Sequence, residues 1–116
     1  REIRDLVAAA QRAGIDAVRP GVSTVDVDAA ARSVIAEAGH GDAFPHGLGH
    51  GVGLEIHEAP FLRWDGGEEL VEGMVVTIEP GVYIPGLGGV RIEDMVEVTA
   101  DGRREIPRST KELIVL

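Results

Sequence analysis

Glycine occupies every second position in one short stretch, GLGHGVG at residues 47–53. Each of these glycines would cost a helix roughly 1 kcal/mol relative to alanine, and no apolar stripe offsets that cost. The pattern therefore predicts an extended segment whose side chains project from one face, namely His46, Leu48, His50, Val52 and Leu54. The bare opposite face predicts close packing against backbone or another element. A glycine-rich loop with two solvent-exposed histidines is the alternative.

Two amphipathic helices are predicted before this segment. Apolar residues recur at three- and four-residue steps over residues 1–18 and again over residues 27–38. Ser23 offers an N-cap hydroxyl for the second helix, and Gly39 ends it. Farther along the chain, β-branched residues bounded by proline and glycine predict strands over residues 74–78, 90–99 and 113–116.

Composition narrows the classes of partner. A chain of 116 residues forms one domain, and a formal net charge of −9 disfavours binding to nucleic acid or to an anionic membrane surface. The sequence shows no apolar run of about 18 residues, which a membrane span needs, and no secretory leader, so we expect a cytoplasmic protein. Because the chain has no cysteine, a bound metal would be held by nitrogen and oxygen donors.

Two glutamates lie among apolar residues on the predicted strands. Glu79 ends one strand and Glu93 lies within the next. A buried carboxylate is costly unless it is paired, protonated or bound to a cation. A salt bridge from Arg91 to Glu93 or to Glu79 is one solution. A metal site made of His50, Glu79 and Glu93 is the other, with donors that suit Mn²⁺, Co²⁺, Fe²⁺ or Zn²⁺. Spacing and composition alone do not choose a reaction.

Three motifs in a fixed order resemble a known family. The chain is similar to the C-terminal part of the pita-bread metallopeptidases, in the Xaa-Pro aminopeptidase and prolidase branch, at FPHGLGHGVGLEIHEAP (44–60), LVEGMVVTIEPGVYIP (70–85) and GGVRIEDMVEVT (88–99). The helical part, with AVRPGVSTVDVDAAARSVIAEAG, shares the resemblance. It implies that residues 1–116 form the C-terminal part of the catalytic domain, an α+β half of the pita-bread fold in which two helices back an antiparallel sheet.

The resemblance also implies a reaction, the metal-dependent hydrolysis of the bond between an N-terminal residue and proline. In the complete site, two divalent ions, most often manganese, would share a bridging water or hydroxide whose pKa the metal lowers. The resemblance assigns His50 and Glu79 as metal ligands and Glu93 as the carboxylate that bridges both ions.

Three further residues receive roles in catalysis. The resemblance assigns His46 and His57 to holding the substrate and to proton transfer around the tetrahedral intermediate. It assigns Arg91 to orienting the substrate or a carboxylate. The expected partner is a peptide with proline at its second position.

Two other ligands of the family's site are aspartates that the resemblance places before residue 1. The helical aspartates Asp5, Asp16, Asp26 and Asp28 have neighbours typical of solvent-exposed positions and are not expected to replace them. We therefore expect a fragment that holds at most one ion well. Because the family fold has two similar halves, we also expect a homodimer or association with the missing N-terminal half.

Other functions of the same fold are the alternatives. A catalytically inactive peptide- or protein-binding module and a metal-free hydrolase of the creatinase kind have little use for buried metal-binding carboxylates, which would repel one another. A peptidase similar to methionine aminopeptidase is the alternative among metal enzymes. The aromatic residues are expected either to line a proline pocket or to join the core, and they are Phe44, Phe61, Trp64 and Tyr83.

Overall fold

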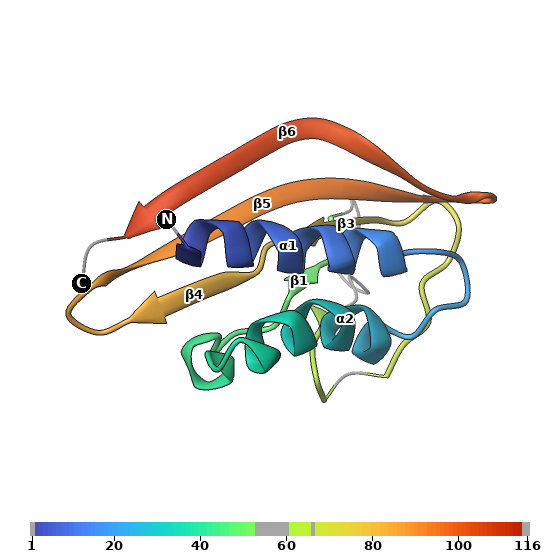
Figure 1. The fold of residues 1–116 in the computed structure, drawn as a ribbon. Helices are drawn as coiled ribbons and strands as arrows, with labels where there is room; N and C mark the ends of the chain where they lie inside the picture. The colour runs from blue at the N-terminus through green and yellow to red at the C-terminus, as the bar shows by residue number, and fades with distance from the viewer. Residues whose placement is uncertain (1, 53–60, 66, 115–116) are drawn as a thin grey trace.

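The structure is a computed structural model that describes residues 2–52, 61–65 and 67–114, with the backbone alone for residue 2 and for residues 107–114 (Figure 1). Its helices are α1 (Glu2–Ala17), α2 (Thr24–Glu37) and the 3₁₀ turn η1 (Gly41–Ala43). Its strands are β1 (Gly49–His50), β2 (Phe61–Leu62), β3 (Val75–Ile78), β4 (Gly81–Ile84), β5 (Gly88–Thr99) and β6 (Gly102–Ile114). In the residues described, no helix has the length and apolar character needed to cross a membrane.

The two amphipathic helices form where the sequence predicts them. The hydroxyl of Ser23 accepts a hydrogen bond from the amide of Val25 at 3.1 Å and so caps α2. The helices pack against each other, and α1 lies across β5 (Figure 1). Their completely buried apolar side chains include Val7 and Ala10 on α1 and Val27, Ala31 and Ile35 on α2.

β5 is the central strand of the main sheet. β3 and β4 pair with one of its edges and β6 with the other, all in the antiparallel direction. Along β5, Ile92, Val96 and Val98 are buried, whereas the residues between them on the other face are partly exposed. The predicted α+β arrangement, two helices backing an antiparallel sheet, is confirmed.

Two strands differ from the sequence prediction. β6 begins at Gly102 and not at Leu113, because its first half is an exposed edge strand with charged side chains such as Arg103 and Arg104, which hide the apolar pattern. β4 is not visible in the sequence pattern, because the Pro80-Gly81 pair before it is typical of a turn. In the structure, β3 before this pair and β4 after it both form hydrogen bonds with β5.

β3 and β4 share one register on β5. Ile78 pairs with Asp94 at the end of β3, and the first residue of β4 pairs with Arg91. The same register, continued through the two residues between these pairs, places Glu79 opposite Glu93. Opposite residues of antiparallel strands project from the same face. Both glutamates therefore belong to the face of the sheet that points away from the helices.

Residues 48–52 lie alongside β3 and join the small β1–β2 sheet to the main sheet. Two backbone hydrogen bonds connect them. The amide of Glu79 donates to the carbonyl of Leu48 at 2.7 Å, and the amide of Val52 donates to the carbonyl of Val75 at 2.6 Å. Gly49 comes so close that a Cβ at this position would be 1.8 Å from the carbonyl oxygen of Thr77. The predicted close packing on the glycine face is confirmed at Gly49.

The close approach at Gly49 generates a stability prediction. Gly49→Ala should lower the free energy of unfolding by about 3 kcal/mol or more, because the new methyl group would meet backbone that cannot rotate away. Chemical denaturation measures this change. Gly41→Ala is the control, because its Cβ would meet the Cβ of Ala36 at an ordinary 3.4 Å and should change stability by less than about 1 kcal/mol. Equal losses in both variants would contradict the role given to Gly49.

Candidate metal centre

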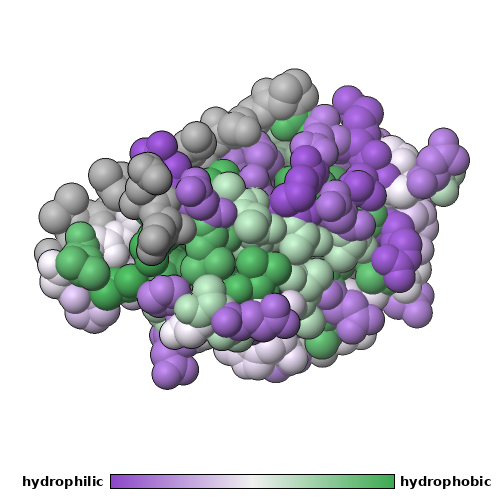
Figure 2. Space-filling model, viewed as in Figure 1, coloured by the Kyte–Doolittle hydropathy of each residue, from purple (hydrophilic) through white to green (hydrophobic). Residues whose placement is uncertain are grey.

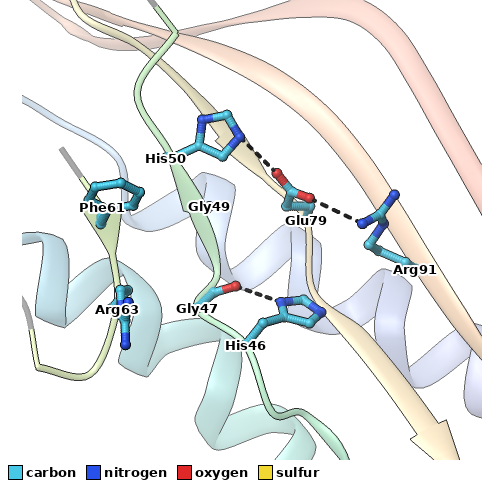
Figure 3. A pocket seen from close by; sticks show the side chains of 8 residues that line it. All are labelled: His46, Gly47, Gly49, His50, Phe61, Arg63, Glu79 and Arg91. Carbon is cyan, nitrogen blue, oxygen red and sulfur yellow. Dashed lines mark hydrogen bonds and ion pairs between the residues drawn. The ribbon is translucent and has the colours of Figure 1, made fainter. Parts of the chain in front are cut away.

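A cavity of about 420 Å³ lies where the segment before and within β1 passes β3 and β5 (Figure 3). Four of the six residues predicted for the site border it, although they are far apart in the sequence. The lining residues are His46, Gly47, Gly49, His50, Phe61, Arg63, Glu79 and Arg91. The fold therefore brings two predicted metal ligands together with two predicted catalytic residues.

Glu79 lies at the centre of this group, with a side chain that is 14% exposed. Its Oε2 accepts a hydrogen bond from the hydroxyl of Thr77 at 2.8 Å and lies 3.4 Å from Nε2 of His50. Its Oε1 lies 3.6 Å from Nη1 of Arg91. The Arg91–Glu79 salt bridge considered from the sequence is thus present as a long contact, and it involves the oxygen that faces away from His50 (Figure 3).

The ring of His50 presents a lone pair to Glu79 when the ring is neutral. Nδ1 of His50 lies 2.9 Å from the carbonyl oxygen of Gly51. Because a carbonyl oxygen only accepts, Nδ1 carries the hydrogen and Nε2 is the acceptor. Nε2 then faces Oε2 of Glu79, a second acceptor, and the two attract only with a proton or another cation between them. A backbone carbonyl that holds the distal ring nitrogen is typical of metal-binding histidines.

The separation of these two donors fits a divalent ion. Two atoms that are each about 2.1 Å from one ion lie about 3.0 Å apart at a right angle and about 3.4 Å apart at the tetrahedral angle. Nε2 of His50 and Oε2 of Glu79 are 3.4 Å apart. An ionised carboxylate oxygen has two lone pairs, so Oε2 can keep its hydrogen bond from Thr77 while it binds an ion. His50 and Glu79 therefore fit as two ligands of one ion.

The other two residues predicted for the site are Glu93 and His57. Glu93 lies opposite Glu79 on β5 and is partly exposed, but it does not line the cavity. Within the part of the chain that the structure describes, no three His, Cys, Asp or Glu side chains group closely enough to hold an ion. The bridging role of Glu93 stays a prediction. His57 lies outside the described residues, and its role also stays a prediction.

His46 lies at the other end of the cavity and has different partners. Its Nδ1 is 2.8 Å from the carbonyl oxygen of Gly47, and its Nε2 is 3.0 Å from the hydroxyl of Tyr83. Nδ1 therefore carries the hydrogen, and Tyr83 donates to Nε2 when the ring is neutral. In Figure 3 the rings of His46 and His50 extend toward the side on which Glu79 and Arg91 lie. Leu48, expected on the same face, is instead completely buried in the core.

Thr77 is a site residue that the sequence analysis did not single out. Its Oγ1 accepts a hydrogen bond from the backbone amide of His50 at 3.0 Å, and its hydroxyl donates to Glu79. One hydroxyl group thus orients both candidate ligands. The signal in the sequence was its position two residues before Glu79 on a predicted strand, which places both side chains on one face.

The aromatic residues divide between the cavity and the core. Phe61 borders the cavity and is 59% exposed, and Tyr83 contacts His46. Phe44 is buried in the core, and Trp64 lies outside the cavity lining. Of the aromatic residues considered for a proline pocket, only Phe61 lines this cavity.

The prediction that Asp28 occupies a solvent-exposed position is wrong. Asp28 is 1% exposed, and its carboxylate pairs with Arg32 on the next turn of α2. Its charge is tolerated in the interior because Arg32 and the amide of Leu48 both donate to it. The other helical aspartates are exposed, as predicted, and they are Asp5, Asp16 and Asp26.

Known proteins match nearly the whole chain. The pattern of the metallopeptidase family M24 matches residues 1–100. The Xaa-Pro dipeptidase of Pyrococcus furiosus is 50% identical over 114 residues, which cover 98% of this chain and 33% of that protein. The structure of the Xaa-Pro dipeptidase from Bacillus anthracis has a TM-score of 0.88 at 50% identity and covers 99% of this chain and 32% of that one. The structure of the X-Pro aminopeptidase from Thermotoga maritima has a TM-score of 0.87 at 36% identity and covers 99% of this chain and 33% of that one.

These matches confirm the resemblance that the three motifs predict. The chain spans about a third of the length of these relatives. Its two helices and antiparallel strands superpose on their structures, so the expected part of a pita-bread fold is confirmed. On the family pattern and on these relatives, the chain belongs to the metallopeptidase family M24.

Proposed function

We propose that this chain carries one part of the metal site of a peptidase that hydrolyses Xaa-Pro bonds, and that further segments of a longer protein complete the site. The observation that carries the proposal is the pair of donor atoms, Nε2 of His50 and Oε2 of Glu79, which face each other at 3.4 Å, a separation that fits a divalent ion between them. The substrate class comes from the similarity to proteins named Xaa-Pro dipeptidases.

We assign His50 and Glu79 as ligands of a divalent ion and Glu93 as the carboxylate that bridges to a second one. The ion would supply a bound water that is acidic enough to act as a nucleophile near neutral pH. Nitrogen and oxygen donors suit Mn²⁺, which is the first ion to test, as well as Co²⁺, Zn²⁺ and Fe²⁺.

The other residues around the cavity bind, orient and transfer protons. Arg91 attracts Oε1 of Glu79 and so leaves Oε2 directed at His50. His46 can exchange a proton at Nε2, where Tyr83 now donates. Phe61 offers an exposed apolar surface for the ring of a proline substrate. We assign His57 to the same group, as the resemblance implies.

Titration of the chain with Mn²⁺ tests the metal site directly. Calorimetry should show one weak site, because the described residues supply only two converging donors. His50→Ala and Glu79→Gln should each abolish binding. His40→Ala should leave it unchanged, because His40 does not line this cavity. Two tight sites would contradict an incomplete centre, and binding that survives both substitutions would place the ion elsewhere.

Hydrolysis tests the proposed reaction. A longer protein that contains this chain should cleave Xaa-Pro dipeptides when Mn²⁺ is present, and the 116-residue chain alone should do so poorly or not at all. In the longer protein, His50→Ala should lower kcat/KM for Xaa-Pro by at least about 100-fold, because it removes a ligand. An Xaa-Ala dipeptide is the control substrate. Mn²⁺ binding without hydrolysis of any Xaa-Pro peptide by the longer protein would instead favour the peptide-binding module.

Association with the rest of the fold is part of the same proposal. Figure 2 shows apolar residues gathered in the middle of the face that carries α1 and α2. Partly buried side chains on these helices include Ile3, Leu6 and Val34. An apolar face of this kind favours docking with a further segment or with a second copy. Sedimentation of the chain at increasing concentration should show dimers, and a monomer at every concentration would contradict self-association.

A further inference from the structure

An ion pair on α2 contacts the segment that carries His46. The side chain of Asp28 is 1% exposed and that of Arg32 is 22% exposed. Nε of Arg32 donates to Oδ1 of Asp28 at 2.8 Å and Nη2 donates to Oδ2 at 3.1 Å, so the pair is bidentate. Neither residue lines the cavity, and no role in binding or catalysis has been assigned to either.

Both members of this pair also bind the backbone of residues 44–48, which precede β1 and belong to no helix or strand. Residues 44–47 belong to no ladder, so their backbone groups need other partners, whereas the amide and the carbonyl of Leu48 also bond to the backbone of Leu62 and Glu79. The contacts are Arg32 Nη1 to the carbonyl of Phe44 at 2.8 Å, Arg32 Nη2 to the carbonyl of His46 at 2.8 Å, and the amide of Leu48 to Oδ2 of Asp28 at 3.0 Å.

Aromatic contacts reinforce the position of Arg32. Its guanidinium carbon lies 4.1 Å from the centre of the Phe44 ring and 4.8 Å from that of Trp64. The Phe44 ring in turn meets the ring of His46 edge-on, with centres 5.1 Å apart. Arg32 therefore reaches His46 by two routes, through the backbone carbonyl and through the ring of Phe44.

His50 has a different support. Its amide is bound to Thr77 on β3, its ring nitrogen to the carbonyl of Gly51, and its strand to β2 and β3. The two histidines of the cavity therefore have different supports: His46 is held by α2 and by Tyr83 of β4, and His50 is held by β2 and β3. Removing one support should leave the other in place.

We propose that Asp28 and Arg32 form a positioning pair that holds the ring of His46 at the cavity and acts on His46 but not on His50. The catalytic meaning of this inference rests on the proposed function, whereas the positioning is a property of the folded chain. Loss of the pair would disturb the step that His46 serves and would leave the ligand pair of His50 and Glu79 intact.

Histidine nitrogen resonances of the 116-residue chain test the proposal without any assay of activity. In the unsubstituted chain His46 should show the Nδ1–H tautomer that its contact with Gly47 requires. Arg32→Gln should shift the His46 ring resonances and mix the two tautomers, while the His50 resonances stay unchanged. Asp28→Asn, which is nearly the same size, should produce the same change because the bidentate charged contact is lost.

A conservative variant shows whether His46 is held by the shape of the Arg32 side chain or by its positive charge alone. Arg32→Lys keeps the positive charge and should stay folded, but an ammonium group does not reproduce the planar fork that joins Asp28 to two carbonyl groups. It should therefore fail to restore the His46 resonances. The matched control is Arg12→Gln, which breaks an exposed Arg–Asp pair of the same spacing on α1, together with the contact of Arg12 with Glu105 on β6, and should leave both histidines unchanged.

Two outcomes would overturn the proposal: His46 resonances of Arg32→Lys that equal those of the unsubstituted chain, or equal shifts of His46 and His50 in Arg32→Gln. Titration of the same variants with Mn²⁺ keeps the two proposals distinguishable. Arg32→Lys should bind Mn²⁺ within about twofold of the unsubstituted chain, since His50 and Glu79 keep their supports. An unsubstituted chain that binds no Mn²⁺ would contradict the metal site and leave the result for His46 standing.

Discussion

The contact between residues 48–52 and β3 determines the rest of the site. Backbone hydrogen bonds on both sides of Gly49 fix the segment, and the absence of a side chain at Gly49 lets it approach the carbonyl of Thr77. Because the segment runs alongside β3, His50 comes to lie beside Thr77 and close to Glu79. A side chain at position 49 would push the segment away and would separate the imidazole from the carboxylate.

The charges of the sheet explain how the salt bridge considered from the sequence is compatible with the proposed metal site. The register that β3 and β4 share on β5 places Glu79, between these two strands, opposite Glu93, and like charges in this arrangement are destabilising. Arg91 compensates one oxygen of Glu79, at 3.6 Å, and the other oxygen faces His50. The salt bridge therefore uses Oε1 of Glu79, and the proposed metal site would use Oε2. Arg91 does not need to leave for a cation to bind between Glu79 and His50.

The sequence predicts the features that depend on periodicity. Both helices, the central strands and the extended segment at His50 follow from spacing, and the glycines correctly predict a close backbone contact. The sequence does not predict β4, because the proline-glycine pair at its start locally favours a turn. In the structure, pairing with β5 keeps this part of the chain extended. The burial of Asp28 is not predicted, because a carboxylate on a helix is normally solvated. Only the tertiary contact with residues 44–48 shows that Asp28 is buried and paired.

The two histidines of HGLGH illustrate where such a motif is informative and where it is not. His50 lies within a ladder, so the position of its ring follows from strand pairing, which an alternating pattern encodes. His46 precedes the ladder, where no neighbouring strand fixes the backbone, and its carbonyl is held by a side chain from α2. A residue outside regular structure can be positioned only by partners that the local sequence does not name. The spacing of the two histidines thus predicts that they lie near each other, and the structure of α2 explains how His46 stays there.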